Sequence, residues 1–464
     1  MAKTNVKNTF QEKTYEGASA SRITPELSLR RSVMSCMLFE SEFYEDGVTI
    51  ADRISELVAE VSPDKVQQIA IDARNKMKLR HVPLWIVRQM ARLDTHKHLV
   101  ADTLFEVLQR ADEPAEFLSL YWKDGRQTVS AQVKKGIARA FRDKGWDEYQ
   151  LGKWNRDGHV KMKDALFISH PKPKDEAQAA LWKKLVDGTL ATPDTWETAI
   201  SSTKGEGKKE QWERLLQEKK LGILALIRNL RNFSECGVND DLIRERLSDT
   251  NPEKALPFRF IAAARYAPRF EPELETAMLK CLSSQEKLSG HTVLLVDVSS
   301  SMHANVSGKS EITRMDAACG VGMLLREIAE KVDVYTFSMK LYQVPPRHGF
   351  ALRDAIVNSQ EHSGTPLGLA VESIYGDGTF KDAHFGSYGT HPVKYTGQRL
   401  RPDRLIVITD EQSADNVPNP IGKGYMVNVA SAKNGVGYGA WNHVDGWSEA
   451  VVDYIRQYEK SGLS

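Results

Sequence analysis

The chain has 464 residues, a formal net charge of +1 and a mean hydropathy of −0.43. A chain of this length exceeds one small domain, so two or three folding units are expected. Its 27% charged and 8% aromatic residues are ordinary for a globular protein and exclude wholesale disorder. The balanced charge excludes a polycation that binds nucleic acid through bulk charge alone.

The first 26 residues form a polar segment without the apolar stretch of a signal peptide. The longest apolar runs, such as LGILALI at 221–227, are far shorter than the ~20 residues that cross a bilayer. The four cysteines (Cys36, Cys236, Cys281 and Cys319) are widely spaced and form no C-x-x-C pair, which argues against a disulfide scaffold or a zinc ribbon. We therefore expect a soluble cytoplasmic protein without a membrane contact.

Residues 27–286 show helical periodicity almost throughout. Apolar residues recur at helical spacing in segments 50–61, 63–77, 83–93 and 97–111, which small breaks separate. Short helices in close succession are typical of a solenoid of helix pairs of the HEAT or armadillo type, although the sequence has no strict repeat. Such an array exposes a long concave face that suits an extended partner.

Residues 291–464 show a different pattern. Near-continuous apolar runs at 291–298, 332–338, 404–410 and 424–430 are typical of buried parallel strands. Helical patterns alternate with them at 314–331, 365–375 and 447–460. This alternation predicts a doubly wound α/β domain. A stretch rich in Gly, His and aromatic residues at 376–402 is expected to be a surface excursion.

Oxygen-bearing side chains follow the strands of this predicted domain. Asp297, Ser299 and Ser301 come at the end of the first strand, and Asp410 ends the strand at 404–410. Thr365 begins a helix in Ser-Gly-Thr-Pro. Ligands of open α/β sheets bind outside the carboxyl ends of the strands, so these oxygens can converge there. Two carboxylates and three hydroxyls suit Mg²⁺ or another hard divalent cation such as Mn²⁺.

This set resembles the metal-ion-dependent adhesion site of von Willebrand factor type A domains, with its D-x-S-x-S motif, its Thr and its Asp in order. The resemblance implies an open coordination position for a partner's carboxylate. A serine-rich turn that binds no metal is the alternative for DVSSS by itself. No His or Glu is placed by a known motif to activate a metal-bound water, and Glu411 is expected on the face opposite Asp410. We therefore predict a protein that is not an enzyme.

A basic stretch lies in the helical half. Residues 123–174 contain 13 Lys and Arg and six Asp and Glu, a net charge of +7 that the rest of the chain cancels. Lys135, Arg139 and Arg142 share one predicted helix face. Trp122, Trp146, Trp154 and His170 are interleaved with the basic residues, which suits contacts to phosphates and unpaired bases. A solvated helix face with core tryptophans is the alternative.

In its order of segments, the helical half resembles the TROVE module of the Ro autoantigen family. The segments that carry the resemblance are LRRSVMSCMLFESEFY (29–44), LGKWNRDGHVKMKDALFISHPKP (151–173), IRNLRNF (227–233) and the D-x-S-x-S domain that follows. The resemblance implies a ring of helical repeats, expected to be monomeric and of the bacterial type. It also implies binding of Y RNA-like RNAs and of the single-stranded 3′ ends of misfolded RNAs.

The same resemblance implies particular RNA contacts. Lys153 corresponds to a family lysine, Arg156 lies in the basic cluster that follows it, and His170 matches the family's SH-x-KP segment. The predicted RNA-binding residues are Lys135, Arg139, Arg142, Lys153, Arg156, His170 and Lys172.

The leading functional hypothesis is a noncoding-RNA-binding ring that scaffolds or gates RNA quality control, with an exoribonuclease or another processing enzyme as a partner. The alternative is a protein-interaction scaffold whose type A domain captures an acidic partner residue through Mg²⁺. A metal-dependent nuclease would need a cluster of several carboxylates, which the sequence does not indicate.

Overall fold

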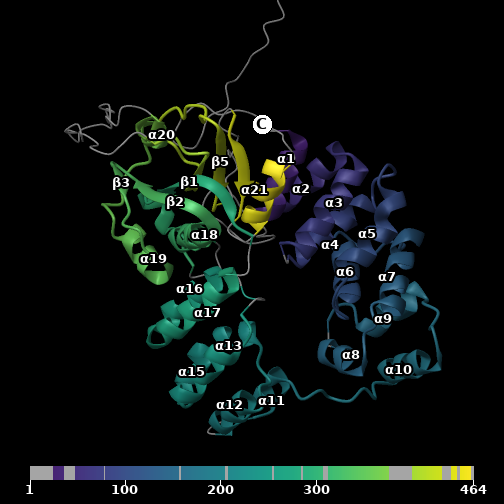
Figure 1. Ribbon diagram of the computed structural model, residues 1–464. Helices are drawn as coiled ribbons and strands as arrows, with labels where there is room; N and C mark the ends of the chain where they lie inside the picture. Colours follow the sequence, from purple (N-terminus) through teal and green to yellow (C-terminus); the bar gives the residue numbers. More distant parts are fainter. Residues whose placement is uncertain are drawn as a thin grey trace, which may run out of the picture.

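The computed structural model describes residues 24–35, 47–77, 79–155, 158–203, 207–252, 255, 257–283, 286–306, 312–375, 400–430, 440–446 and 450–460. Helices make up the described chain up to Ser283, and a six-stranded sheet flanked by helices follows. Figure 1 shows the elements arranged in a closed circuit, in which α1 (Pro25–Ser35) returns to contact β6 (Asn442–Asp445). The predicted fold class, a helical array followed by a doubly wound α/β domain, is confirmed.

The first group of helices has a hydrophobic core of its own, which extends from Leu29 to Leu185. After α1 it comprises α2 (Gly47–Glu60), α3 (Pro63–Asn75), α4 (His81–Met90), a 3₁₀ turn (Lys97–Leu99), α5 (Val100–Val107), α6 (Glu113–Tyr121), α7 (Ala131–Asp143), α8 (Glu148–Trp154), α9 (Met162–Ser169) and α10 (Glu176–Asp187). Helix α7 shows how the sequence forms these elements. The Ser130 side chain caps its start, and Val133, Ile137 and Phe141 recur at helical spacing on its buried face.

The second group of helices shares its core with the sheet. It comprises α11 (Trp196–Ser202), α12 (Gly207–Gln217), α13 (Ile223–Arg228), α14 (Leu230–Glu235), α15 (Asp240–Asp249), α16 (Pro257–Tyr266), a 3₁₀ turn (Pro268–Phe270) and α17 (Glu271–Ser283). A single cluster of buried residues runs from Trp212 through Phe260 and Met278 to Leu294 in the sheet. Because α16 and α17 pack against the first helix after β1, this core does not divide at residue 286, and the sequence-based domain limits remain a prediction.

The sheet has the strand order β3-β2-β1-β4-β5-β6, and its pairs are parallel except for β2 with β3. The strands before β6 are β1 (Leu288–Asp297), β2 (Ala329–Phe337), β3 (Leu341–Gln343), β4 (Arg404–Thr409) and β5 (Lys423–Asn428). The helices are a 3₁₀ turn (Ser300–His303), α18 (Arg314–Ile328), α19 (Gly349–Val357), α20 (Leu367–Tyr375) and α21 (Ala450–Lys460). In β1, Leu294 and Val296 face one core while Val293 and Leu295 face the other, so both sides of the strand are covered.

Besides the 3₁₀ turn at Ser300–His303, three described elements of the sheet domain were not predicted. Strand β3 is a three-residue edge strand with two exposed side chains, and β6 reads Asn-His-Val-Asp. Both are too short and too polar to show a strand pattern without their neighbours. Helix α19 was also missed, because its nine residues offer little more than two turns of periodicity. Most of the predicted excursion at 376–402 lies outside the described residues.

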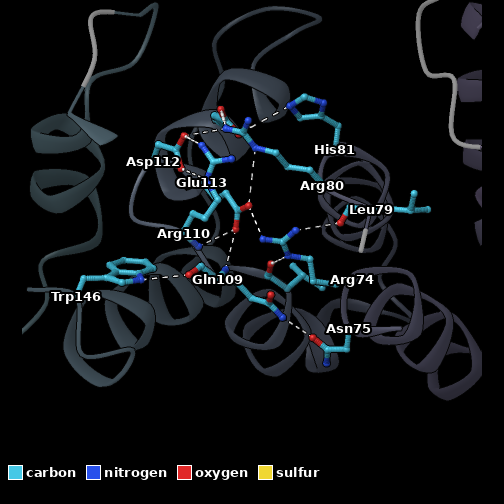
Figure 2. Close-up of polar contacts among 12 residues, drawn as sticks. Arg74, Asn75, Leu79, Arg80, His81, Gln109, Arg110, Asp112, Glu113 and Trp146 are labelled. Carbon is cyan, nitrogen blue, oxygen red and sulfur yellow. Dashed lines mark hydrogen bonds and ion pairs between the residues drawn. The ribbon is translucent and has the colours of Figure 1, made fainter. Parts of the chain in front are cut away.

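A buried network of charges fixes the turn between α5 and α6 (Figure 2). The Arg74 guanidinium donates to the Glu113 carboxylate at 2.6 Å and to the carbonyl oxygens of Val107 and Leu79. The other Glu113 oxygen accepts from the backbone NH groups of Gln109 and Arg110. Glu113 is fully buried, so this network satisfies a carboxylate that would otherwise be strongly unfavourable.

Within the described residues, no helix is long and apolar enough to cross a bilayer.

Candidate metal centre and nucleic-acid interface

Asp297 and Asp410 lie at the carboxyl ends of the neighbouring parallel strands β1 and β4, where Val296 pairs with Ile408. Both aspartates are completely buried. The Thr409 hydroxyl donates to Oδ2 of Asp297 at 2.6 Å, and the backbone NH of Ser299 donates to its Oδ1 at 2.8 Å. The topology of the sheet therefore brings together the two predicted carboxylates, which are 113 residues apart in the chain.

The three loops that carry the predicted ligands are joined by backbone hydrogen bonds. The NH of Ser300 donates to the Ser363 carbonyl oxygen at 3.0 Å, and the NH of Ala414 donates to that of Thr365, also at 3.0 Å. The hydroxyl oxygens of Ser299 and Ser301 lie 3.2 Å apart. Ser299 and Thr365 are buried, so the loops form a compact and well-supported site.

The donors of this site suit a hard divalent cation. Burial, and next the neighbouring Asp410 carboxylate, raise the pKa of Asp297. A cation between the carboxylates would relieve this like-charge repulsion, and hydroxyl and carboxylate oxygens are the ligands that Mg²⁺ prefers. Among the described residues, no group of three or more His, Cys, Asp or Glu side chains could hold a metal, so the hydroxyls would have to complete the set.

One buried residue at this site was missed in the sequence. Arg314 opens α18, its side chain is 2% exposed, and its NH1 lies 3.1 Å from Oδ2 of Asp410 and 3.4 Å from the Ser301 carbonyl oxygen. The available signal was its position at the start of the helix after β1, because that end of the helix lies at the carboxyl edge of the sheet.

Glu411 follows Asp410 but belongs to a different contact. Its backbone has a φ of 60°, in the left-handed region, and its buried carboxylate lies 2.7 Å from Nδ1 of His443 on β6. The Glu411 side chain therefore pairs with β6, which lies beyond β5 in the sheet.

The basic residues of α7 are only partly available to a ligand. Arg139 pairs with Asp102 and lies over the Phe105 ring at 4.5 Å, and Arg142 pairs with Asp143 at 3.0 Å. Lys135 is exposed. Neighbouring carboxylates thus compensate two of the three charges on the face that the sequence predicted.

Two cations lie over one tryptophan at the next predicted site. The Lys153 ammonium is 5.2 Å and the Arg110 guanidinium 3.4 Å from the centre of the Trp154 ring. Arg110 had not been predicted, because it comes from the turn before α6. Arg156 lies outside the described residues.

His170 and Lys172 follow α9 and are both exposed. His170 is the residue at which the helix ends, with a φ of 48° in the left-handed region, and its NH donates to the Leu166 carbonyl oxygen at 3.1 Å. This turn directs the chain out of the helix and leaves the imidazole in solvent.

A pocket with a volume of about 890 Å³ lies between α6 and α9 and was not predicted as a unit. The exposed Phe167 ring lines it together with Trp122, and the Arg126 guanidinium lies 5.1 Å from the Trp122 ring centre. The other lining residues are Ser119, Leu120, Lys123, His159, Val160, Asp164 and Ile168. Phe167 is 54% exposed, which makes it the most exposed large apolar side chain of the described residues. The pocket therefore combines open aromatic surface with positive charge.

Comparisons with known proteins agree with this architecture. Residues 188–318, from the end of α10 into α18, match the model of the TROVE domain. The structure is similar to the crystal structure of the Ro (RSR) protein of Deinococcus radiodurans, with a TM-score of 0.63 and 18% sequence identity. The similarity covers 95% of this chain and 100% of that one. The chain thus carries a segment that matches the TROVE domain, and its fold is similar to that of this Ro protein over nearly its whole length.

Proposed function

We propose that this protein binds noncoding RNA through the helical half and acts as a scaffold or gate in RNA quality control, without catalysis of its own. The observation that carries the proposal is the pocket between α6 and α9, where Phe167 and Trp122 stand beside Lys123 and Arg126. Aromatic rings stack on unpaired bases and basic side chains contact phosphates, so the pocket suits single-stranded RNA.

The similarity to the Ro protein and to the TROVE domain supports a more specific proposal. Y RNA-like RNAs and the 3′ single-stranded ends of misfolded RNAs are the expected ligands, the cytoplasm is the expected compartment, and an exoribonuclease is the expected partner of a monomeric ring. The exposed His170 and Lys172, and Lys153 over Trp154, would add contacts outside the pocket.

A binding experiment with the full chain tests the proposal. Fluorescence anisotropy would compare an RNA duplex that has a single-stranded 3′ extension with the same duplex made blunt. We expect the extension to tighten binding, and Phe167→Ala to remove most of that gain. Tyr342→Ala is the matched control, since Tyr342 is an exposed aromatic residue, 44% accessible, in the C-terminal domain. Equal affinity for both duplexes would contradict the proposal.

A second experiment tests the contacts implied by the family. Lys153→Ala and His170→Ala should each weaken binding of a structured Y RNA-like RNA, whereas Arg231→Ala, at an exposed position on α14, should not. Crosslinking in cells followed by sequencing would identify the bound RNA class. Unchanged affinity in the Lys153→Ala/His170→Ala double variant would contradict the RNA contacts that the resemblance to the Ro family implies.

The loops around Asp297 and Asp410, which backbone hydrogen bonds join, favour a second function. This function is the capture of an acidic partner residue through a divalent cation. Asp297, Ser299, Ser301, Thr365 and Asp410 would hold the cation, which would supply a positive charge for the partner's carboxylate. Asp297→Ala should then abolish the capture of that partner and leave RNA affinity unchanged. Retention of every partner by Asp297→Ala, and by the wild type in EDTA, would contradict this second function.

A further inference from the structure

The candidate metal centre already contains a positive charge that belongs to the protein. The Arg314 guanidinium lies 3.1 Å from the Asp410 carboxylate, and the two side chains are 2% and 0% exposed. A buried carboxylate is strongly unfavourable unless it is paired, and here the guanidinium of Arg314 supplies a positive charge beside Oδ2 of Asp410.

The position of Arg314 shows that this pairing is specific. Arg314 is the first residue of α18, where the helix dipole disfavours a cation. The same helix end has its acidic residue at Asp316, whose carboxylate accepts from the Thr313 NH at 2.8 Å and also pairs with Arg265 of α16. The contact with Asp410 therefore has to offset both burial and the dipole for Arg314 to stay in place.

The backbone around Arg314 is well fixed. Its NH donates to the Ala304 carbonyl oxygen at 2.9 Å, and the Thr313 side chain caps the helix by accepting from the Asp316 NH. Because Ser301 ends the D-x-S-x-S motif and Ala304 follows it closely, the guanidinium is held against the same loop that would bind a cation.

A divalent cation at this site would need Asp410 and would lie close to the guanidinium. Two positive charges in a buried environment repel each other strongly, since little water is present to screen them. We propose that Arg314 competes with the divalent cation for Asp410 and keeps the cation affinity of this site low. Metal binding then requires the guanidinium to leave the carboxylate.

The test is a titration of the full chain with Mn²⁺, a spectroscopic substitute for Mg²⁺, followed by electron paramagnetic resonance of the free ion. Arg314→Gln should bind Mn²⁺ at least tenfold more tightly than the wild type. The matched control is Arg404→Gln, which removes another buried arginine of the same domain, paired with Glu459 at 2.7 Å and placed at the start of β4, the end of that strand opposite Asp410. It should leave the Mn²⁺ affinity unchanged.

Two further variants keep the test decisive. Adding Asp410→Asn to Arg314→Gln should remove the gain, because the contested carboxylate is then lost. Arg314→Lys retains the positive charge but lacks the planar guanidinium. Its affinity for Mn²⁺ should therefore increase less than that of Arg314→Gln. If Arg314→Gln folds poorly, saturating Mn²⁺ should raise its melting temperature more than that of Arg314→Lys. Equal or weaker Mn²⁺ binding by Arg314→Gln, or an equal gain in Arg404→Gln, would overturn the proposal.

Discussion

Arg74 and Glu113 form an ion pair of 2.6 Å inside the helical half, where the glutamate is fully buried and the arginine side chain 9% exposed (Figure 2). Arg74 lies near the end of α3, and Glu113 begins α6, 39 residues later in the chain. Through the NH of Arg110, the same carboxylate holds the turn from which the Arg110 guanidinium reaches Trp154. The pair thus links the packing of the helices to the placement of a cation at the predicted RNA surface.

Glu113→Gln should destabilise the protein by about 3–5 kcal/mol, because it leaves the Arg74 charge buried without its partner. Denaturant unfolding followed by circular dichroism measures the loss. Glu235→Gln is the control, since it breaks the exposed pair with Arg231 (57% and 65% accessible) and should cost less than about 1 kcal/mol. Losses of equal size in the two variants would show that the network of Figure 2 is not a major support of the fold.

The stability of the protein should depend on Glu116 at mildly acidic pH. Burial raises the pKa of Glu116 from 4.5 to about 7, although Arg80 lies beside it. Between these values the folded state holds a proton that the unfolded state has released, so this residue's contribution to stability falls as the pH rises from 4.5 to 7.

Glu116→Gln should remove this dependence, so the variant gains stability relative to the wild type as the pH rises. Melting temperatures of both proteins from pH 4.5 to 8 measure the difference. A difference that stays constant over this range would contradict the raised pKa.

The affinity of the pocket for RNA should have two contributions that can be measured separately, one from charge and one from stacking. Lys123→Gln and Arg126→Gln should each reduce the slope of log affinity against log salt by about 0.7, because each removes one phosphate contact. Phe167→Ala should lower the affinity by about 1–3 kcal/mol and leave the slope unchanged, because stacking releases no counterion. Anisotropy titrations at four salt concentrations provide both quantities. A change of slope in Phe167→Ala would argue against this division.

Gly368, in the first turn of α20, should not tolerate a side chain. A Cβ there would lie 2.1 Å from the Asn416 carbonyl oxygen, in the loop after Asp410. Gly368→Ala should therefore destabilise the C-terminal domain by about 1–3 kcal/mol.

Gly322→Ala is the matched control, since its Cβ would lie 3.6 Å from Cδ1 of Ile356, an ordinary contact inside α18. This change should stabilise the protein by about 1 kcal/mol through helix propensity. Calorimetric melting of the two variants compares them directly, and an equal effect of the two changes would contradict the close approach at Gly368.

Much of the architecture could be predicted from the sequence. The helical spacing of Val133, Ile137 and Phe141 and the apolar run of β1 depend on local periodicity, which the chain carries residue by residue. The elements that were missed, β3 and β6, are too short to show a period and form only because a neighbouring strand offers hydrogen bonds.

The sequence by itself determined the two kinds of structure, their order along the chain and the oxygen-bearing residues around Asp297. Only the tertiary structure decided how these residues are surrounded. It placed Arg314 against Asp410, 96 residues away, and it placed Asp102 against Arg139. It also gathered Phe167 and Arg126 around one pocket. Periodicity fixes which face of an element is buried, whereas pairing between distant side chains depends on how the elements pack, and that packing sets the charge and the access of each site.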